Sequence, residues 1–287
     1  NEWDQGLMRG KPLINRMGGL RRPRHRILGS DIAGVVEAVG PAVTRFRPGD
    51  AVFGDLSASG FAAFAQYALA PATALSRKPA SLTFEQAAAI PQAGGLAVAG
   101  LRKTEPSGVG RRLLVNGAGG GVGTFAIQVG KAHGWDVTGV DGSGKLEAMR
   151  TLGADHTIDF RRVDFTRTGE QYDLILDMVA NRSPLDYARA LRPRGVGAVV
   201  GGSTGRLAMT AVFGQSLRLS AGKHVSLVTY RANRTEDMAL LLRQICDGTV
   251  TPVIDRAFEL AEAPEAMRYY LQGNFVGKIV LRVGPER

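Results

Sequence analysis

Short apolar runs separated by turn residues fill much of the chain between residues 26 and 80. The runs cover 32–39, 51–53 and 61–69, and Pro48-Gly49-Asp50 forms a turn signal ahead of the second run. Runs of this length, rich in β-branched and aromatic side chains and bounded by Gly, Pro and Asp, are typical of strands. The pattern predicts a small, mostly β domain within residues 1–80.

The composition changes to alanine-rich over residues 83–103. Thr83 and Glu85 at the start of this stretch are typical of a helix N-terminus. Pro91 lacks a backbone N–H and must break or kink the helix. We therefore expect an interrupted helical stretch that leads into a second domain.

From residue 113 onward, apolar runs alternate with helical segments. The runs lie at 113–116, 137–140, 156–160, 172–179, 197–200 and 224–230. This alternation predicts an α/β domain with a doubly wound parallel sheet over residues 81–249, ending with a helix near 236–246. A run at 250–260, a helix at 264–271 and a strand at 278–283 indicate that residues 250–287 return to the first domain.

Composition narrows the class of protein. The chain has 287 residues, 44% of them apolar and 22% charged, which is typical of a soluble globular protein of two domains. No apolar run approaches the roughly 20 residues of a membrane span, and we expect no signal peptide. Cys246 is the single cysteine, which excludes an intramolecular disulfide and thiolate metal clusters, so we expect a cytoplasmic protein.

The charge balance is basic, with 36 Lys and Arg against 26 Asp and Glu. Such an excess attracts nucleic acids or other anions. However, the one dense basic cluster is Arg21, Arg22, Arg24 and Arg26, and no aromatic residues interleave it. We therefore rank nucleic-acid binding below a solvated, arginine-rich surface that favours a phosphate-bearing ligand.

The stretch 113–129 carries the most specific signal. An apolar strand leads into Asn116-Gly-Ala-Gly-Gly-Gly-Val-Gly123 and then directly into an amphipathic helical segment. Ala118, Gly120 and Gly123 occupy the three spaced positions of a dinucleotide-binding fingerprint. The turn must be tight, the backbone must approach a pyrophosphate, and the helix N-terminus offers N–H donors. The stretch predicts a site for NAD or NADP.

Residues after the next strand leave the choice of dinucleotide open. Asp141 ends that strand, where a carboxylate accepts the ribose hydroxyls of NAD and repels a 2′-phosphate. Ser143 and Lys145 follow on the same loop and could hold that phosphate. Lys145 is also explained as a solvated lysine at a helix start, so NAD and NADP both remain open.

A second glycine-rich pattern, Gly201-Gly-Ser-Thr-Gly205, matches the G-x-S-x-G turn of serine hydrolases. That fold requires an acidic residue and then a histidine downstream, but no Asp or Glu lies between Ser203 and His224. We interpret the pattern as the ligand-binding end of the fifth strand. The four histidines lack metal-binding spacing, so no metal site is expected.

Six motifs occur in a fixed order: Leu28–Gly40, Phe46–Gly54, Ala88–Gly94, Asn116–Gly123, Leu152–Asp159 and Gly277–Leu281. Together they resemble the zinc-independent quinone oxidoreductase (zeta-crystallin-like) branch of the medium-chain dehydrogenase/reductase superfamily, over essentially the whole chain. The resemblance implies a Rossmann domain and a GroES-like substrate domain that is N-terminally incomplete here. Zinc-dependent relatives carry Gly-His-Glu where this chain has Gly29-Ser30-Asp31, so the resemblance also implies that zinc is absent.

The resemblance assigns site residues. It places Asn1 and Asp4 beside the nicotinamide and substrate as candidate catalytic residues. With the motifs above, it gives the cofactor-binding set Gln92, Ala118, Gly119, Gly120, Gly121, Val122, Gly123, Asp141, Ser143, Lys145, Asp177, Val179, Gly201, Gly202, Ser203, Phe275, Val276, Gly277 and Lys278. Two departures from the family pattern, Leu96 for a threonine and Gly6 for a tyrosine, leave the contacts to the cofactor amide and the proton donor undefined.

The sequence therefore predicts an NAD(P)H-dependent reductase of quinones or α,β-unsaturated carbonyls, with NADP(H) slightly favoured by the resemblance. The alternative is a non-catalytic cofactor-binding or assembly protein, and a nucleic-acid binder ranks third. In relatives the sixth strand lies at a subunit interface, and the apolar run 224–230 leads us to expect a homodimer.

Overall fold

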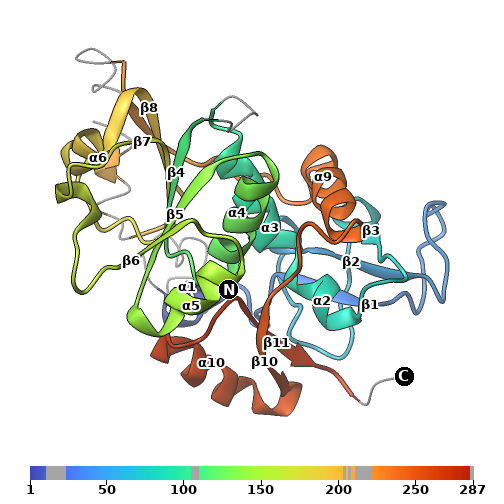
Figure 1. Ribbon diagram of the computed structural model, residues 1–287. Coiled ribbons are helices and arrows are strands. Elements are labelled where there is room, and N and C mark those ends of the chain that lie inside the picture. Colours follow the sequence, from blue (N-terminus) through green and yellow to red (C-terminus); the bar gives the residue numbers. More distant parts are fainter. Residues whose placement is uncertain (11–23, 105–109, 203–204, 206–207, 211–221, 285–287) are drawn as a thin grey trace. The chain divides into compact units, whose positions relative to one another are not determined.

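The computed structural model describes residues 1–10, 24–104, 110–202, 205, 208–210 and 222–284. The chain forms two compact units (Figure 1). Unit 1 comprises Asn1–Gly95, Arg231–Leu242 and Pro252–Arg287, and unit 2 comprises Leu96–Tyr230 and Arg243–Thr251. Unit 1 is therefore built from three separate stretches of the chain.

Unit 1 contains two small sheets. An antiparallel sheet has the order β1-β2-β3, and β10 pairs in parallel with β11. The strands are β1 (Asp31–Val35), β2 (Ala51–Asp55), β3 (Leu75–Arg77), β10 (Ile254–Glu259) and β11 (Lys278–Arg282). Phe46, Val52 and Leu75 pack together as the core of the antiparallel sheet. The strands predicted at 32–39, 51–53 and 278–283 are confirmed, with adjusted ends, and the apolar run at 250–260 contains β10.

The strand predicted at 61–69 is wrong. Phe61 and Ala62 have φ angles of 64° and 74°, outside the β region open to L-residues. Within this run Phe61 is only 5% exposed, whereas Tyr67 and Leu69 are 76% and 96% exposed, so the run is apolar without forming a strand and is only partly buried. The third strand of the sheet is β3 instead.

Helices surround the strands of unit 1. Those that lie wholly or partly in it are α1 (Glu2–Arg9), α2 (Phe84–Ala89), α3 (Pro91–Leu101), α9 (Thr235–Cys246) and α10 (Ala263–Gln272). Thr83 caps α2 in a reciprocal pair of hydrogen bonds with Gln86. The interruption predicted at Pro91 is found, because α2 ends at Ala89 and α3 begins at Pro91.

The two units differ from the domains predicted from the sequence, whose boundaries were placed after residues 80 and 249. Helix α2 belongs to unit 1 because it packs on β1, β2, β10 and β11. Residues 231–242 also belong to unit 1, where the Asn233 side chain accepts a hydrogen bond from Asp55 N at 2.8 Å and donates one to Asp55 O at 2.7 Å. These long-range contacts leave no local pattern in the sequence.

Unit 2 is a parallel six-stranded sheet with the order β6-β5-β4-β7-β8-β9. Its strands are β4 (Arg112–Asn116), β5 (Asp136–Asp141), β6 (His156–Asp159), β7 (Tyr172–Asp177), β8 (Leu191–Val199) and β9 (His224–Leu227). This is the doubly wound Rossmann order, with its switch point between β4 and β7. The predicted fold class is confirmed.

Among the described residues, the helices that pack on this sheet include α4 (Gly121–Ala132), α5 (Leu146–Thr151) and α6 (Pro184–Ala190). Helix α4 contacts β4 and β5, α5 contacts β5 and β6, and α6 contacts β8 and β9. Leu114, Ile175 and Tyr187 are among the buried side chains of the core between them.

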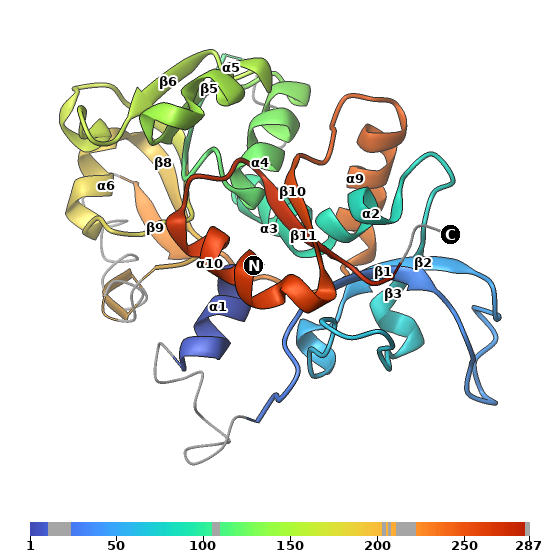
Figure 2. The same cartoon turned by 90° about the horizontal axis from the view of Figure 1, so that it is seen from below.

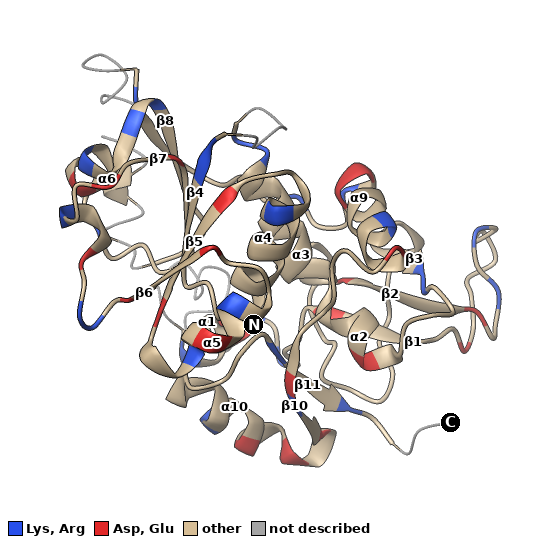
Figure 3. Cartoon of the chain, viewed as in Figure 1, with Lys and Arg blue, Asp and Glu red and all other residues tan. Residues whose placement is uncertain are grey.

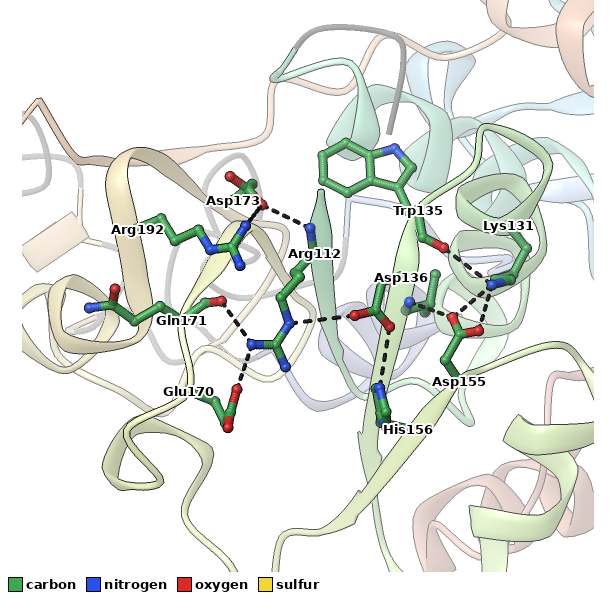
Figure 4. A network of polar contacts seen from close by, with 11 residues as sticks. Arg112, Lys131, Trp135, Asp136, Asp155, His156, Glu170, Gln171, Asp173 and Arg192 are labelled. Carbon is green, nitrogen blue, oxygen red and sulfur yellow. Dashed lines mark hydrogen bonds and ion pairs between the residues drawn. The ribbon is translucent and has the colours of Figure 1, made fainter. Parts of the chain in front are cut away.

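Charged side chains link neighbouring strands at the amino-terminal edge of this sheet (Figure 4). Arg112, the first residue of β4, pairs with Glu170 and Asp136, and its backbone N–H donates to Asp173 at 2.8 Å. Asp155 accepts hydrogen bonds from Lys131 Nζ and Val137 N, both at 2.7 Å. These contacts tie β4 to β5 and β7 at that edge.

Candidate functional site

The glycine loop joins β4 to α4 at the carboxyl edge of the sheet. The backbone N–H groups of Gly117 and Ala118 donate to Val140 O at 2.9 and 3.1 Å, which anchors the loop to β5. Gly117 has a φ of 85°, a conformation that favours glycine. The chain thus turns tightly from β4 into α4, as the sequence predicted.

Two glycines of this loop meet different surroundings. A Cβ at Gly123 would lie 2.3 Å from Gly117 O, so the close packing of α4 on the loop requires glycine there. A Cβ at Gly120 would meet only Gly117 O, at 3.4 Å. Gly120, Gly121 and Val122 are partly exposed at the start of α4, where N–H groups have no intrahelical acceptor. This cradle fits the pyrophosphate of a dinucleotide.

Asp141 ends β5 beside the loop. Its Oδ2 accepts from Gly119 N at 2.9 Å, and its Oδ1 accepts from Gly142 N at 2.8 Å. Lys145 Nζ lies 3.6 Å from Asp141 Oδ1, and both side chains are mostly buried. Ser143 is exposed on the short 3₁₀ turn between them. The structure therefore brings the three predicted ribose-end residues together and offsets the carboxylate charge with an ammonium group.

Asp177, at the carboxyl end of β7, is 0% exposed and accepts four hydrogen bonds. Two come from the side chains of Asn116 and Tyr187, at 2.9 and 2.8 Å. The others come from the backbone N–H groups of Val179 and Ala180, at 2.7 and 2.8 Å. Asp177 thus shapes the loop after β7, while Val179 is 45% exposed.

Burial and the neighbouring Asp177 carboxylate raise the pKa of Tyr187 far above its usual value. Tyr187 therefore stays protonated and acts as a hydrogen-bond donor. Neither Asn116 nor Tyr187 was predicted from the sequence as part of this site. Asn116 had a signal, since it precedes the glycine loop directly, whereas nothing in the pattern marks Tyr187.

Gly201 and Gly202 follow β8 at the same edge. A Cβ at Gly202 would lie 2.4 Å from Ala180 Cβ, so the loops after β7 and β8 touch. Ser203 lies outside the described residues. The six predicted residues of the glycine loop thus share one edge of unit 2 with Asp141, Lys145, Asp177 and the two glycines.

The predicted residues of unit 1 gather around a buried ion pair. Lys278 Nζ lies 2.9 Å from Asp31 Oδ2 and 2.5 Å from Asn1 Oδ1. The Asn1 amide nitrogen donates to Ser30 Oγ at 2.8 Å and to Asp31 Oδ2 at 3.0 Å. Side chains of Lys278 and Asp31 are 9% and 7% exposed. We call Asn1, Ser30, Asp31 and Lys278 the Lys278 cluster.

Gln92 and Asp4 are hydrogen-bonded to Asp31 and Gly29, at or beside the Lys278 cluster. Gln92, in the first turn of α3, donates its backbone N–H to Asp31 Oδ1 at 3.0 Å, and its side chain is buried. Asp4 is 1% exposed and accepts from Gly29 N at 3.0 Å. Its catalytic role stays a prediction, and in the structure its carboxylate holds the backbone before Ser30.

The segment 275–277 leads into Lys278 and is held at several points. Val276 N donates to Asp255 Oδ1 at 2.8 Å, and Phe275 stacks on Tyr270 with ring centroids 4.9 Å apart. Tyr270 OH donates to Glu2 Oε2 at 3.0 Å. Figure 2 shows α10, which carries Tyr270, alongside β10 and β11. Burial and the neighbouring Glu2 carboxylate raise the pKa of the Tyr270 hydroxyl. Tyr270 therefore stays protonated and keeps its hydrogen bond to Glu2.

The described part of the chain contains neither a cluster of metal-ligand side chains nor a membrane-spanning helix. No group of three or more His, Cys, Asp and Glu side chains there could hold a metal ion. Ser30, at the position where zinc-dependent relatives carry a histidine, accepts a hydrogen bond from the Asn1 side chain. None of the helices described is long and apolar enough to span a bilayer.

Basic residues are interspersed with acidic ones in both units (Figure 3). Arg47, Arg150 and Arg189, for example, each pair with a carboxylate three residues away. Arg24 and Arg26 of the predicted basic cluster are described, whereas Arg21 and Arg22 lie outside the described residues. Part of the arginine excess is thus locally paired.

Comparisons with known proteins support the same architecture. The family model "Alcohol dehydrogenase GroES-like domain" matches residues 2–80, and "Zinc-binding dehydrogenase" matches residues 152–281. A quinone oxidoreductase from Coxiella burnetii has the same fold, with a TM-score of 0.86 at 24% identity over 99% of this chain and 87% of that one.

Relatives in sequence are of two kinds. The chain is 33% identical to the polyketide synthase GfsB of Streptomyces halstedii, over 92% of this chain but only 5% of that much longer protein. It is 31% identical to the mitochondrial NAD(P)H oxidoreductase RTN4IP1 of Mus musculus, over 89% of this chain and 70% of that protein. The glycine loop, the sheet order and these similarities agree: the chain belongs to the medium-chain dehydrogenase/reductase superfamily, and quinone oxidoreductases are among its relatives in sequence.

Proposed function

We propose that the chain is an NAD(P)H-dependent reductase that transfers hydride to a quinone or an α,β-unsaturated carbonyl without a metal. The glycine loop at the start of α4 carries this proposal, because its partly exposed N–H groups and the space at Gly120 suit a pyrophosphate. The relatives named as NAD(P)H oxidoreductase and quinone oxidoreductase support the reaction class.

Each unit has a defined task in this proposal. When bound, the nicotinamide cofactor supplies the hydride. The backbone of Gly120–Val122 binds the pyrophosphate, and Asp177 fixes the loop after β7 that borders it. In unit 1, Asn1 and Lys278 provide polar N–H groups, the kind of donor that stabilises negative charge as it develops on a carbonyl oxygen.

A turnover screen tests the reaction. Purified protein is mixed with NADPH or NADH and a panel of simple quinones and enones, and loss of nicotinamide absorbance is followed. Turnover of at least one acceptor is expected. Cofactor binding without turnover would favour a non-catalytic cofactor-binding or assembly protein, and salt-dependent retardation of DNA without cofactor binding would favour a nucleic-acid binder.

For the cofactor, we favour NADP(H). Repulsion between Asp141 and a 2′-phosphate is offset by Lys145, whose ammonium group lies 3.6 Å from the carboxylate. Both Asp141 oxygens also accept backbone N–H groups, which compete with ribose hydroxyls. Lys145→Ala should weaken NADPH binding about tenfold, or 1.4 kcal/mol, and leave NADH binding nearly unchanged. Lys145→Arg is the control that keeps the charge; equal losses for both cofactors would instead favour an NAD enzyme.

Zinc independence is tested directly. Because Ser30 and Asp31 do not provide a zinc ligand set with their neighbours, elemental analysis should find no stoichiometric zinc and chelators should leave turnover intact. One zinc per chain in the purified protein would overturn this part of the proposal.

We also propose a homodimer formed through β9. This strand is at the edge of the six-stranded sheet, and Leu227 at its end is 36% exposed. An unpaired edge strand with apolar residues favours association. Light scattering should return the mass of a dimer, and a monomer mass at micromolar concentration would contradict it.

A further inference from the structure

Among the described residues of unit 1, the side chain of Gln92 has a buried amide nitrogen without a hydrogen-bond partner. It is 4% exposed, and among the described residues none accepts a hydrogen bond from its amide nitrogen. Leaving a buried amide donor unpaired destabilises the folded state. Buried polar groups that lack a partner therefore call for an explanation, and binding of a ligand is one such explanation.

The surroundings of Gln92 indicate which ligand chemistry fits. The residue lies in the first turn of α3, an end that carries partial positive charge, and its backbone N–H already binds Asp31 Oδ1. Asp31 Oδ2 is bound by Lys278 and Asn1. The acceptor groups of the Lys278 cluster are therefore engaged, while the Gln92 amide nitrogen still has a donor to offer. A group that only accepts hydrogen bonds, such as a carbonyl oxygen, suits it.

We infer that the Gln92 amide donates a hydrogen bond to a carbonyl oxygen of the bound ligand. This inference rests on the proposed function, which offers two such oxygens: that of the substrate and that of the nicotinamide carboxamide. When the β-carbon of an enone accepts hydride, the electron pair of the C=C bond moves toward the carbonyl oxygen, and a proton from water completes the product. A donor at that oxygen stabilises the enolate as it forms.

Gln92→Met tests the inference because it keeps the length of the side chain and removes the amide. One donor to a developing oxyanion is worth roughly 100-fold in rate, so kcat/KM for an enone should fall at least tenfold. Removal of an unpaired buried amide should leave Tm unchanged or raise it.

Gln128→Met is the matched control. Gln128 is also a buried glutamine on a helix, but its amide nitrogen donates to Thr124 O and Thr251 O, both at 3.0 Å, and its Oε1 accepts from Thr251 N at 2.8 Å. This variant should lower Tm and leave kcat/KM unchanged. Gln92→Met should thus lower kcat/KM without lowering Tm, and Gln128→Met should lower Tm without lowering kcat/KM.

Titration with NADPH separates the two sources of the carbonyl oxygen. An unchanged Kd for NADPH with a reduced kcat/KM assigns Gln92 to the substrate oxygen, and a weaker Kd assigns it to the carboxamide. A Gln92→Met protein with wild-type kcat/KM and wild-type Kd overturns the inference. If the wild-type protein turns over no acceptor, the proposed function fails, and the inference is then decided by NADPH Kd alone: a weaker Kd in Gln92→Met supports it, and an equal Kd rejects it.

Discussion

At the amino-terminal edge of the six-stranded sheet, Asp136, Asp155 and Asp173 pair with arginine, lysine and histidine side chains. At the carboxyl edge, Asp141 and Asp177 accept hydrogen bonds from backbone N–H groups of the loops that follow the strands. The same residue type thus links strands at one edge and shapes loops at the other. Substitutions at the first edge should change stability alone, and those at the second should also change cofactor binding.

The largest effects are expected within the glycine loop. Gly123→Val should unfold or strongly destabilise unit 2, because even a Cβ there would lie 2.3 Å from Gly117 O and 2.5 Å from Ala118 Cα. Gly120→Val should keep the fold and weaken NAD(P)H binding on the order of 100-fold, because the new side chain enters the space proposed for the pyrophosphate. Circular dichroism and cofactor titration measure the two effects; unchanged affinity in Gly120→Val would mean that the phosphate site is misplaced.

Two buried tyrosines allow the edges to be compared by the same substitution. Tyr187→Phe removes a donor to the buried Asp177 and should cost about 1–3 kcal/mol of unfolding free energy. It should also weaken cofactor binding severalfold, because Asp177 holds Val179 and Ala180. Tyr172 is equally buried, at the amino-terminal edge, and its hydroxyl bonds to Thr138. Tyr172→Phe should lower stability without changing the Kd for NADPH, and equal changes in Kd for both variants would remove the distinction between the edges.

Arg112→Met probes the strand-linking network itself. The Arg112 side chain is 23% exposed and pairs with Glu170 and Asp136, so its loss should cost about 1 kcal/mol, less at high salt. Urea denaturation at two salt concentrations measures this. NADPH affinity should not change, and a weaker Kd would show that the amino-terminal edge is coupled to the cofactor loop.

The smallest effect concerns pH. Burial by itself raises the pKa of Asp155, but hydrogen bonds from Lys131 and Val137 N outweigh it and hold that pKa below its usual value. Asp155 therefore stabilises the fold above about pH 4, and this contribution is lost as the pH falls through its lowered pKa. In Asp155→Asn the unfolding free energy from urea denaturation should fall less steeply below pH 4. The difference should be well under 1 kcal/mol, because the Asp155 side chain is 36% exposed and its ion pair is screened by solvent. An identical pH profile in the variant would contradict this assignment.

Features that depend on residues close together in the chain could be predicted from the sequence, whereas contacts between distant residues could not. The six strands of unit 2, the turn at Gly117 and the end of β5 at Asp141 were accessible because they depend on local runs and on glycine spacing. The Lys278–Asp31 pair and the Asn233–Asp55 contact join residues distant in the chain, and no single-sequence periodicity encodes them. The strand predicted at 61–69 was wrong because the run has the composition of a strand, whereas its backbone is irregular, with positive φ at Phe61 and an exposed Leu69.

The three-part construction of unit 1 has a consequence for how the protein forms. The hydrogen bond from Lys278 to Asn1 joins residues 277 positions apart, whereas the β4–β5 pairs of unit 2 join residues within one strand-helix-strand repeat. Closing a long loop costs more entropy and slows folding. During synthesis, unit 2 can complete its sheet while unit 1 still waits for residues 252–287. Refolding should therefore proceed in two kinetic phases, with the Rossmann sheet in the fast phase and the Lys278 cluster assembled in the slow one.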